Sequence, residues 1–377
     1  MNNKVVIIGK DHHNALGVIE SLGWKGIRSY IVILSPRNKS YLGHSKYVES
    51  GWTGANEEDI IRILLKNFTD KENKAVVYAC DDESAVILDK NHSLLEPYFF
   101  LPTTQQAGEL SRFMQKELMS QLANEVGLTI PKTWVSHNNI IPNDIQYPII
   151  TKAHSSVEGG KDNIHICNNR TELEKVLNDS HCETMVFQQF IDKDFEFQLM
   201  GCSLNGGETV LIPGRTHIDR PNGMDNTFFL RFDKCEEELK DIIEKATTFV
   251  RRTKYTGPFS IEFLEDKSGE IYFTEMNFRN DGNAICVAKS GTNIHYILYL
   301  YFTGGDYLNE INQSKVERVY LVPEIYYFTC MLKHEFSFKE WCRNMRKANC
   351  YTTWFRNDPL PFFFFLYWAI TKRLLKK

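Results

Sequence analysis

The chain has 377 residues, of which 42% are hydrophobic and 24% are charged. These proportions exclude a mostly disordered chain, and the length predicts two or three packed domains. The formal net charge of −4 shows no basic excess of the kind that nucleic-acid-binding proteins carry, so we expect no nucleic-acid partner.

The nine cysteines are spread along the chain and include no Cys-x-x-Cys pair. An odd number at such spacings favours reduced thiols over a disulfide framework and lacks the ligand pattern of a zinc site. The first residues, Met1–Ile8, lack the pattern of a secretory signal peptide. We therefore expect a cytoplasmic protein.

Strands and helices alternate over the first hundred residues. Short apolar runs predict strands at 5–8, 30–34, 75–78 and 99–101, and helical spacing predicts helices at 15–22, 57–68 and 85–90. This alternation is typical of an open parallel sheet, and we place this α/β domain at residues 1–105.

The middle of the chain is α+β, because its strands and helices are segregated. We expect helices at 111–126, 171–177 and 237–254, and strands at 148–152, 164–167, 186–190, 195–202, 208–212, 259–264 and 271–275. This second domain covers residues 106–305. Residues 306–377 form a C-terminal extension, which we expect to be helical and which is rich in aromatic residues.

Two neighbouring strands carry the most informative polar residues. Glu262 and Glu275 lie on opposite sides of a turn, so a hairpin can direct both carboxylates at one point. Asn277 and Arg279 follow Glu275 at intervals of two and share its face. Carboxylate and amide oxygens suit Mg²⁺, and a guanidinium suits phosphate. The alternative is a solvated edge hairpin with alternating polar residues.

Ile-Glu-Phe-Leu followed by Phe-Thr-Glu-Met-Asn-Phe-Arg resembles the paired metal-binding strands of ATP-grasp enzymes. The resemblance covers about residues 105–300 and extends to carboxylate–amine ligases of the D-aspartate ligase type. It implies a pre-ATP-grasp domain at 1–105, an ATP-grasp domain at 106–305 and a lid at about 130–190. It also implies ATP and Mg²⁺ (or Mn²⁺) as cofactors, with Glu262, Glu275 and Asn277 as the metal ligands.

Further motifs carry the same resemblance, and they imply the residues that bind the nucleotide. Lys116 and Lys152 match the two lysines of the family, although the usual Lys-Pro is Lys-Ala here. The segment Ser155–Lys161 resembles the phosphate loop, and Val186–Ile191 resembles the strand whose backbone binds adenine. The implied nucleotide-binding residues are Lys116, Lys152, Ser156, Gly159, Gly160, Gln188, Gln189, Phe190 and Ile191, with either Asp194 or Glu196 on the ribose.

The family transfers the γ-phosphoryl group of ATP to a carboxylate, and an amine then attacks the acyl phosphate. The resemblance implies that Lys152 and Arg279 offset the charge that gathers during this transfer. Arg215 or Arg220, in a polar segment at 213–223, could hold a substrate carboxylate, or this segment could be a plain surface loop. His12 or His13 follows the first strand and could contact the acceptor, although the pattern favours an ordinary surface histidine for each. The loop that contains them lacks Gly-x-Gly-x-x-Gly, which disfavours dinucleotide binding.

The C-terminal segment combines aromatic residues at 362–368 with a basic end at 372–377. Its apolar run is too short to span a membrane, but it suits a helix that lies in a membrane interface. The alternative is a helix docked on the protein itself or on a dimer partner.

The sequence as a whole predicts an ATP-dependent ligase that joins a small-molecule carboxylate to an amine. The basic, aromatic tail suggests contact with the inner face of the membrane and an acceptor among cell-envelope or polysaccharide precursors. A homodimer is the commonest assembly for such a chain. Two alternatives remain, which are a bicarbonate-activating carboxylase-type enzyme and an ATP-binding protein without turnover.

Overall fold

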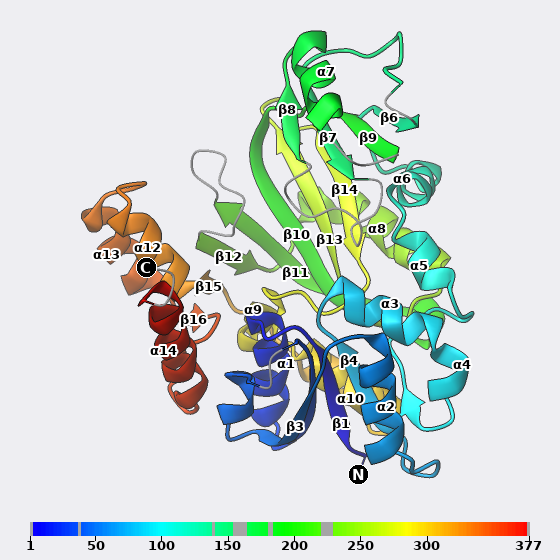
Figure 1. The fold of residues 1–377 in the computed structure, drawn as a ribbon, viewed down its shortest axis with the longest axis vertical. Helices are drawn as coiled ribbons and strands as arrows, with labels where there is room; N and C mark the ends of the chain where they lie inside the picture. Colours follow the sequence, from blue (N-terminus) through cyan, green and yellow to red (C-terminus); the bar gives the residue numbers. More distant parts are fainter. Residues whose placement is uncertain are drawn as a thin grey trace.

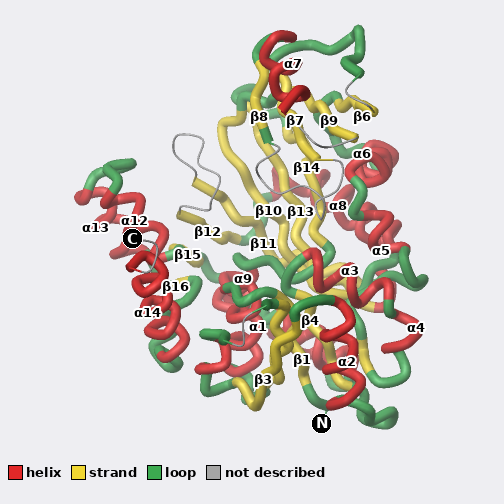
Figure 2. The backbone as a smooth tube through the Cα atoms, in the orientation of Figure 1, coloured by secondary structure: helices red, strands yellow, loops and turns green. Residues whose placement is uncertain are grey.

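The structure, a computed structural model, describes residues 3–36, 39–137, 140–153, 164–179, 184–219 and 229–374. Its strands form three sheets. Figure 1 shows a parallel sheet at the N-terminal end of the molecule, a long sheet in the middle and a small sheet at the opposite end. The last helices of the chain lie beside the long sheet (Figure 2).

The N-terminal sheet has five parallel strands in the order β3-β2-β1-β4-β5. These are β1 (Val5–Gly9), β2 (Ser29–Leu34), β3 (Val48–Gly54), β4 (Ala75–Ala79) and β5 (Phe99–Phe100). The helices that connect them are α1 (His13–Gly23), α2 (Glu57–Asn67), α3 (Asp82–Lys90) and α4 (His92–Leu95), with the short 3-10 helix η1 (Leu42–His44). The predicted parallel α/β arrangement is confirmed. Strand β3 was not predicted, because three exposed residues in a row at its centre interrupt the apolar pattern.

The long sheet has seven strands in the order β14-β13-β10-β11-β12-β15-β16, and all its pairs are antiparallel except the last. Its strands are β10 (Lys193–Leu204), β11 (Thr209–Asp219), β12 (Phe229–Asp233), β13 (Gly257–Asp266), β14 (Ile271–Asn277), β15 (Val319–Val322) and β16 (Cys350–Tyr351). Helix α8 (Lys240–Thr253) covers one face, where Phe249 contacts Phe273 with ring centroids 5.2 Å apart. The 3-10 helices η3 (Asn205–Gly207) and η5 (Glu237–Leu239) flank it.

The small sheet has four strands in the order β6-β9-β7-β8 and is built from one continuous stretch of chain. These strands are β6 (Thr133–His137), β7 (Ile149–Ala153), β8 (His165–Cys167) and β9 (Thr184–Gln189), and helix α7 (Arg170–Asp179) packs on them. A separate core that includes Ile149, Leu173 and Phe187 holds this sheet together. By contrast, two larger cores each combine residues of the parallel sheet with residues of the long sheet.

Two predictions between these sheets were wrong. The helix predicted at 111–126 is two helices, α5 (Glu109–Phe113) and α6 (Lys116–Glu125), separated by a turn at Met114 and Gln115. The segment predicted as a polar loop from 213 is strand through Asp219, because its polar residues alternate on the two faces of β11.

The C-terminal extension is only partly helical. Helices α9 (Ala284–Ser290) and α10 (Ile294–Phe302) precede this extension, whose own helices are α11 (Tyr307–Gln313), α12 (Glu324–Leu332), α13 (Phe338–Lys347) and α14 (Leu360–Leu374). Strands β15 and β16 from the same region extend the long sheet, which corrects the prediction of a wholly helical extension. In the described part of the chain, no helix combines the length and apolar character that a membrane crossing needs.

Candidate active site

The predicted hairpin of β13 and β14 is present, and it pairs the two predicted carboxylates. Glu262 lies directly opposite Glu275, and Ser260 lies opposite Asn277. Directly paired residues on antiparallel strands point to the same face, so the two carboxylates are neighbours. Two like charges in this position repel each other, and a bound cation or donor must offset that repulsion.

A chain of hydrogen bonds connects this carboxylate pair to the end of β14. Gln198 of β10 donates to Glu262 at 3.1 Å, and the amide nitrogen of Asn277 lies 3.4 Å from the same carboxylate oxygen. Arg279 donates to the amide oxygen of Asn277 at 3.0 Å. Asn283 donates to the side-chain oxygen of Gln198 at 3.2 Å. This bond fixes the orientation of the Gln198 amide, so that the amide nitrogen of Gln198 points at Glu262.

The sequence prediction missed Gln198. It is 3% exposed and interrupts the apolar run Phe197–Cys202 of β10. A buried amide needs polar partners, so this interruption was the available signal. Its partner Glu262 lies 64 residues further along the chain, and only the β10–β13 register reveals the pairing.

A cavity of about 320 Å³ lies between the small sheet and the long sheet. It brings together most of the residues that the sequence proposed for nucleotide and metal binding. Those on its wall are Lys116, Lys152, Gln188, Gln189, Phe190, Ile191, Glu196, Glu262 and Glu275. Asp194, the other ribose candidate, is exposed and does not line the cavity.

Lys152 is the buried cation of this cavity. Burial lowers its pKa, whereas the carboxylates Glu275 and Glu262 act in the opposite direction. Its ammonium group donates to the side-chain oxygen of Gln188 at 2.7 Å, and Lys116 adds a second positive charge nearby. Two cations that face two carboxylates in a desolvated cavity suit a ligand with several negative oxygens.

Replacing Lys152 by methionine is expected to weaken ATP binding about tenfold or more without lowering thermal stability in the absence of nucleotide. The lowered pKa of Lys152 means that the folded protein disfavours its charge, so removing that charge relieves a cost of folding. The thermal midpoint, measured with and without Mg-ATP, tests both parts.

Lys175→Met is the matched control, because Lys175 is exposed on α7 in the same lobe. This variant should keep the full stabilisation by Mg-ATP. A Lys152→Met protein that Mg-ATP stabilises as strongly as the wild type would contradict the assignment of Lys152 to the phosphates.

The N-terminal domain meets the end of β14 beside this cavity. Arg279 donates to Asp82 at 2.9 Å and lies 3.6 Å from Asp281. Although burial disfavours its charge, these carboxylates hold the pKa of Arg279 above its ordinary value. Because β1 and β4 end here, Arg279 sits at the carboxyl edge of the parallel sheet, where open α/β sheets form ligand crevices.

The loop after Arg279 packs tightly on the turn that follows β1. Asn280 donates to the backbone oxygen of Asn14 at 2.8 Å. A Cβ at Gly282 would lie 2.3 Å from the side chain of Asn14 and 2.7 Å from that of His13, so any larger residue would have to displace these two side chains. Burial lowers the pKa of His13 to about 3, so this imidazole is neutral at pH 7. His12 caps α1 and is exposed beside this junction.

Comparison with known proteins agrees with this arrangement. The chain is similar to D-aspartate ligase of Enterococcus faecium (strain Aus0004), with 22% identity over 260 residues that make up 63% of this chain and 61% of that protein. Its fold is similar to that of L-amino acid ligase from Bacillus licheniformis, with a TM-score of 0.64, 19% identity, and coverage of 81% of this chain and 74% of that chain. These likenesses show that the chain has the fold of the ATP-grasp enzymes.

The fold is also similar to that of biotin carboxylase from Campylobacter jejuni in its β,γ-ATP complex. The TM-score is 0.65 at 16% identity, and the match covers 84% of this chain and 74% of that chain. No protein-family model matches the chain. The chain spans 61% of the length of the D-aspartate ligase, which is less than two thirds.

Some residues expected from the ATP-grasp resemblance are not brought to the cavity. Arg215 lies on β11 with an ion pair of 3.2 Å to Glu236, and its guanidinium lies 5.9 Å from the ring of Phe197. It is absent from the cavity wall, whereas its neighbour on the other face of the strand, Thr216, bonds to Gln198. Four other candidates lie outside the described residues: Ser156, Gly159, Gly160 and Arg220.

The metal site that the ATP-grasp resemblance implies would consist of two carboxylates, Glu262 and Glu275, and the amide of Asn277. No cluster of three or more His, Cys, Asp or Glu that could hold a metal occurs in the described ranges. Glu262 and Glu275 nevertheless fit Mg²⁺, which takes one or two protein carboxylates and completes its shell with phosphate oxygens and water. The amide oxygen of Asn277 accepts from Arg279 here and keeps a second lone pair, with which it could also bind the metal.

Proposed function

We propose that this protein is an ATP-dependent ligase that joins a carboxylate to an amine and releases ADP and phosphate. The observation that supports this most strongly is the cavity that combines Lys116 and Lys152 with the directly opposed Glu262 and Glu275. The names of the D-aspartate ligase and the L-amino acid ligase support a carboxylate–amine reaction.

The reaction would proceed in two steps. The substrate carboxylate attacks the γ-phosphorus of ATP, the bond to the bridging oxygen breaks, and ADP leaves. The amine then attacks the acyl phosphate, loses a proton, and expels inorganic phosphate as the amide forms. Phosphoryl transfer of this kind needs positioning and charge stabilisation more than a nucleophilic side chain.

Each site residue would have a defined role. Lys116 and Lys152 would hold phosphate oxygens, with Gln188 orienting the Lys152 ammonium. Glu262 and Glu275, with Asn277, would hold Mg²⁺ or Mn²⁺, which would neutralise phosphate charge. Gln188–Ile191 would contact the adenine and Glu196 the ribose.

Arg279 would stabilise the acyl phosphate on the side of the N-terminal domain. Its contact with Asp82 and its closeness to His12 support a role at the junction of the two sheets, where the carboxylate and amine would meet. The small sheet over the cavity would keep water from the acyl phosphate.

The finer proposal concerns the acceptor, which we infer to be a cell-envelope or polysaccharide precursor modified at the inner face of the membrane. The aromatic C-terminal helix supports this location.

Turnover of Mg-ATP against pools of amino acids, dicarboxylates and amino sugars tests the ligase proposal. One pool should release ADP and phosphate with the wild type, and a chelator or the Glu275→Gln variant should abolish that release. ATP binding without turnover in any pool would favour a non-catalytic ATP-binding protein. Turnover that needs bicarbonate and no amine would favour the carboxylase type, whose fold neighbour is biotin carboxylase.

A further inference from the structure

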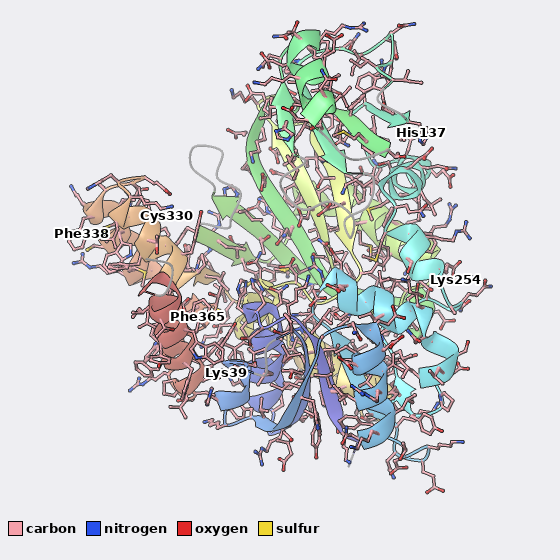
Figure 3. The ribbon with its side chains drawn as sticks, viewed as in Figure 1. Lys39, His137, Lys254, Cys330, Phe338 and Phe365 are labelled. Carbon is pink, nitrogen blue, oxygen red and sulfur yellow. The ribbon has the colours of Figure 1, made fainter. Side chains whose placement is uncertain are left out.

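Helix α14 has two different faces. Its inner face packs on the N-terminal domain: Phe364 stacks on His44 with ring centroids 3.4 Å apart, and Phe365 lies 5.1 Å from Tyr41. Figure 3 shows Phe365 on the side of α14 that faces this domain. These contacts hold the helix against the N-terminal domain, so the side chains on its opposite face point into solvent.

The outer face of α14 is an exposed apolar stripe. Leu360, Phe363, Tyr367 and Ile370 are 51%, 53%, 61% and 51% exposed. Their spacing of three, four and three residues places all four on one side of the helix. Large apolar side chains that share one exposed face mark an interaction site rather than ordinary surface.

The neighbouring helices add to this apolar surface. Leu332 and Phe338 are 59% and 63% exposed, and Figure 3 shows Phe338 at the outer edge of the molecule. Trp341 packs against Phe338 and Phe328 with ring centroids 5.7 Å and 6.0 Å apart. The apolar exposure of the described chain is thus concentrated in helices α12, α13 and α14.

The charge of this region is opposite to that of the rest of the chain. Residues 324–377 contain ten Lys or Arg and four Asp or Glu, although the whole chain carries a net charge of −4. Four of these cations, at positions 372, 373, 376 and 377, follow the α14 stripe in the sequence. A basic region with exposed aromatics complements an anionic lipid surface, whereas two such regions repel each other in a dimer.

A cavity of about 500 Å³ opens beside the first turn of α14. Lys289 and Arg356 line it together with Trp24 and Trp354, and both cations are exposed. Trp354 also contacts Phe363 of the stripe, with ring centroids 6.0 Å apart. The buried carboxyl of Glu20 adds no negative charge at pH 7, because burial and the adjacent Asp358 raise the pKa of Glu20 to about 9.

We propose that the outer face of α14 docks the protein on an anionic lipid bilayer, with a phospholipid phosphate bound in the cavity that Lys289 and Arg356 line. The apolar stripe enters the interface, and Trp354 lies where the stripe meets the cavity. Docking does not depend on ligase chemistry, although it would bring the active site to the membrane-bound acceptor of the proposed function. Binding is measured without ATP, so failure of docking and failure of the ligase proposal are separate results.

Co-sedimentation with vesicles tests the proposal. Wild-type protein should bind phosphatidylglycerol–phosphatidylcholine vesicles and should dissociate as salt rises, whereas vesicles of phosphatidylcholine alone should bind it weakly. The double variant Phe363→Ser/Tyr367→Ser should lose roughly tenfold or more of this binding, because it removes two large apolar contacts. Lys289→Glu/Arg356→Glu should lower binding to the anionic vesicles by a similar factor.

Leu308→Ser is the matched control, because Leu308 is 55% exposed on α11, outside this surface. It should bind vesicles like the wild type, and all variants should keep the wild-type thermal midpoint because the altered side chains are exposed. Equal binding to both vesicle types, or unchanged binding by the α14 variant, would overturn the proposal. Self-association of the wild type that Phe363→Ser/Tyr367→Ser abolishes, with no vesicle binding, would instead assign the stripe to a second copy of the chain.

Discussion

The Glu275→Gln variant is expected to lose ATP turnover by about 10²–10³-fold while it keeps its fold. Glu275 lies opposite Glu262 at the wall of the nucleotide cavity, and glutamine has nearly the same shape but no charge. Removing one of two opposed carboxylates also relieves their repulsion, so the thermal midpoint without nucleotide should not fall. Steady-state release of ADP and a thermal melt measure the two effects.

Glu238→Gln is the control for this variant, because Glu238 is exposed on η5 and away from the cavity. It makes the same chemical change and should leave turnover unchanged. Full activity of Glu275→Gln would show that ATP turnover does not need the paired carboxylates. A drop in the nucleotide-free melting temperature would mean that Glu275 stabilises the fold instead.

The Arg279→Met variant is expected to lose both turnover and about 3–5 kcal/mol of stability. Arg279 is only 15% exposed and pairs with both Asp82 and Asp281, so its removal leaves two carboxylates without their cation. It also leaves the amide oxygen of Asn277 without its donor, which disrupts the hydrogen-bond network that connects Asn277 with Glu262. Urea unfolding gives the stability change, and ADP release gives the activity.

A second substitution separates these two effects. Asp82→Asn in the Arg279→Met background removes one unpaired charge, so it should recover part of the stability and none of the activity. Arg62→Met is the control for the loss of an ion pair, because Arg62 pairs with Asp59 in solvent and should change stability by about 1 kcal/mol or less. Recovery of turnover in the double variant would show that Arg279 acts only through the fold.

The features that the sequence predicted correctly depend on residues close together in the chain. The Glu262–Glu275 hairpin spans a short turn, and the parallel strands are continuous apolar runs, so local pattern was sufficient for both. Lys116, Lys152 and the adenine-binding strand Val186–Ile191 could be proposed only by resemblance to a family. No local pattern connects Lys152 with Gln188 on a neighbouring strand.

The features that the sequence did not predict depend on contacts between distant segments. Asp82 meets Arg279 across 197 residues, and nothing near either residue indicates that contact. Arg215 was expected in a polar loop at 213–223, but pairing with β10 and β12 keeps its part of this segment extended. The two C-terminal strands are short and are recognised only by the sheet edge that they complete.

The distribution of the hydrophobic cores has a consequence for how the molecule opens. Val6 and Ile8 of β1 share a core with Phe259 and Ile261 of β13, so the parallel sheet and the long sheet must unfold together as one cooperative unit. The small sheet has a core of its own and can separate from the rest at a smaller free-energy cost. In the proposed ligase, nucleotide exchange would therefore need only local opening of the small sheet, while Glu262, Glu275 and Arg279 would stay assembled.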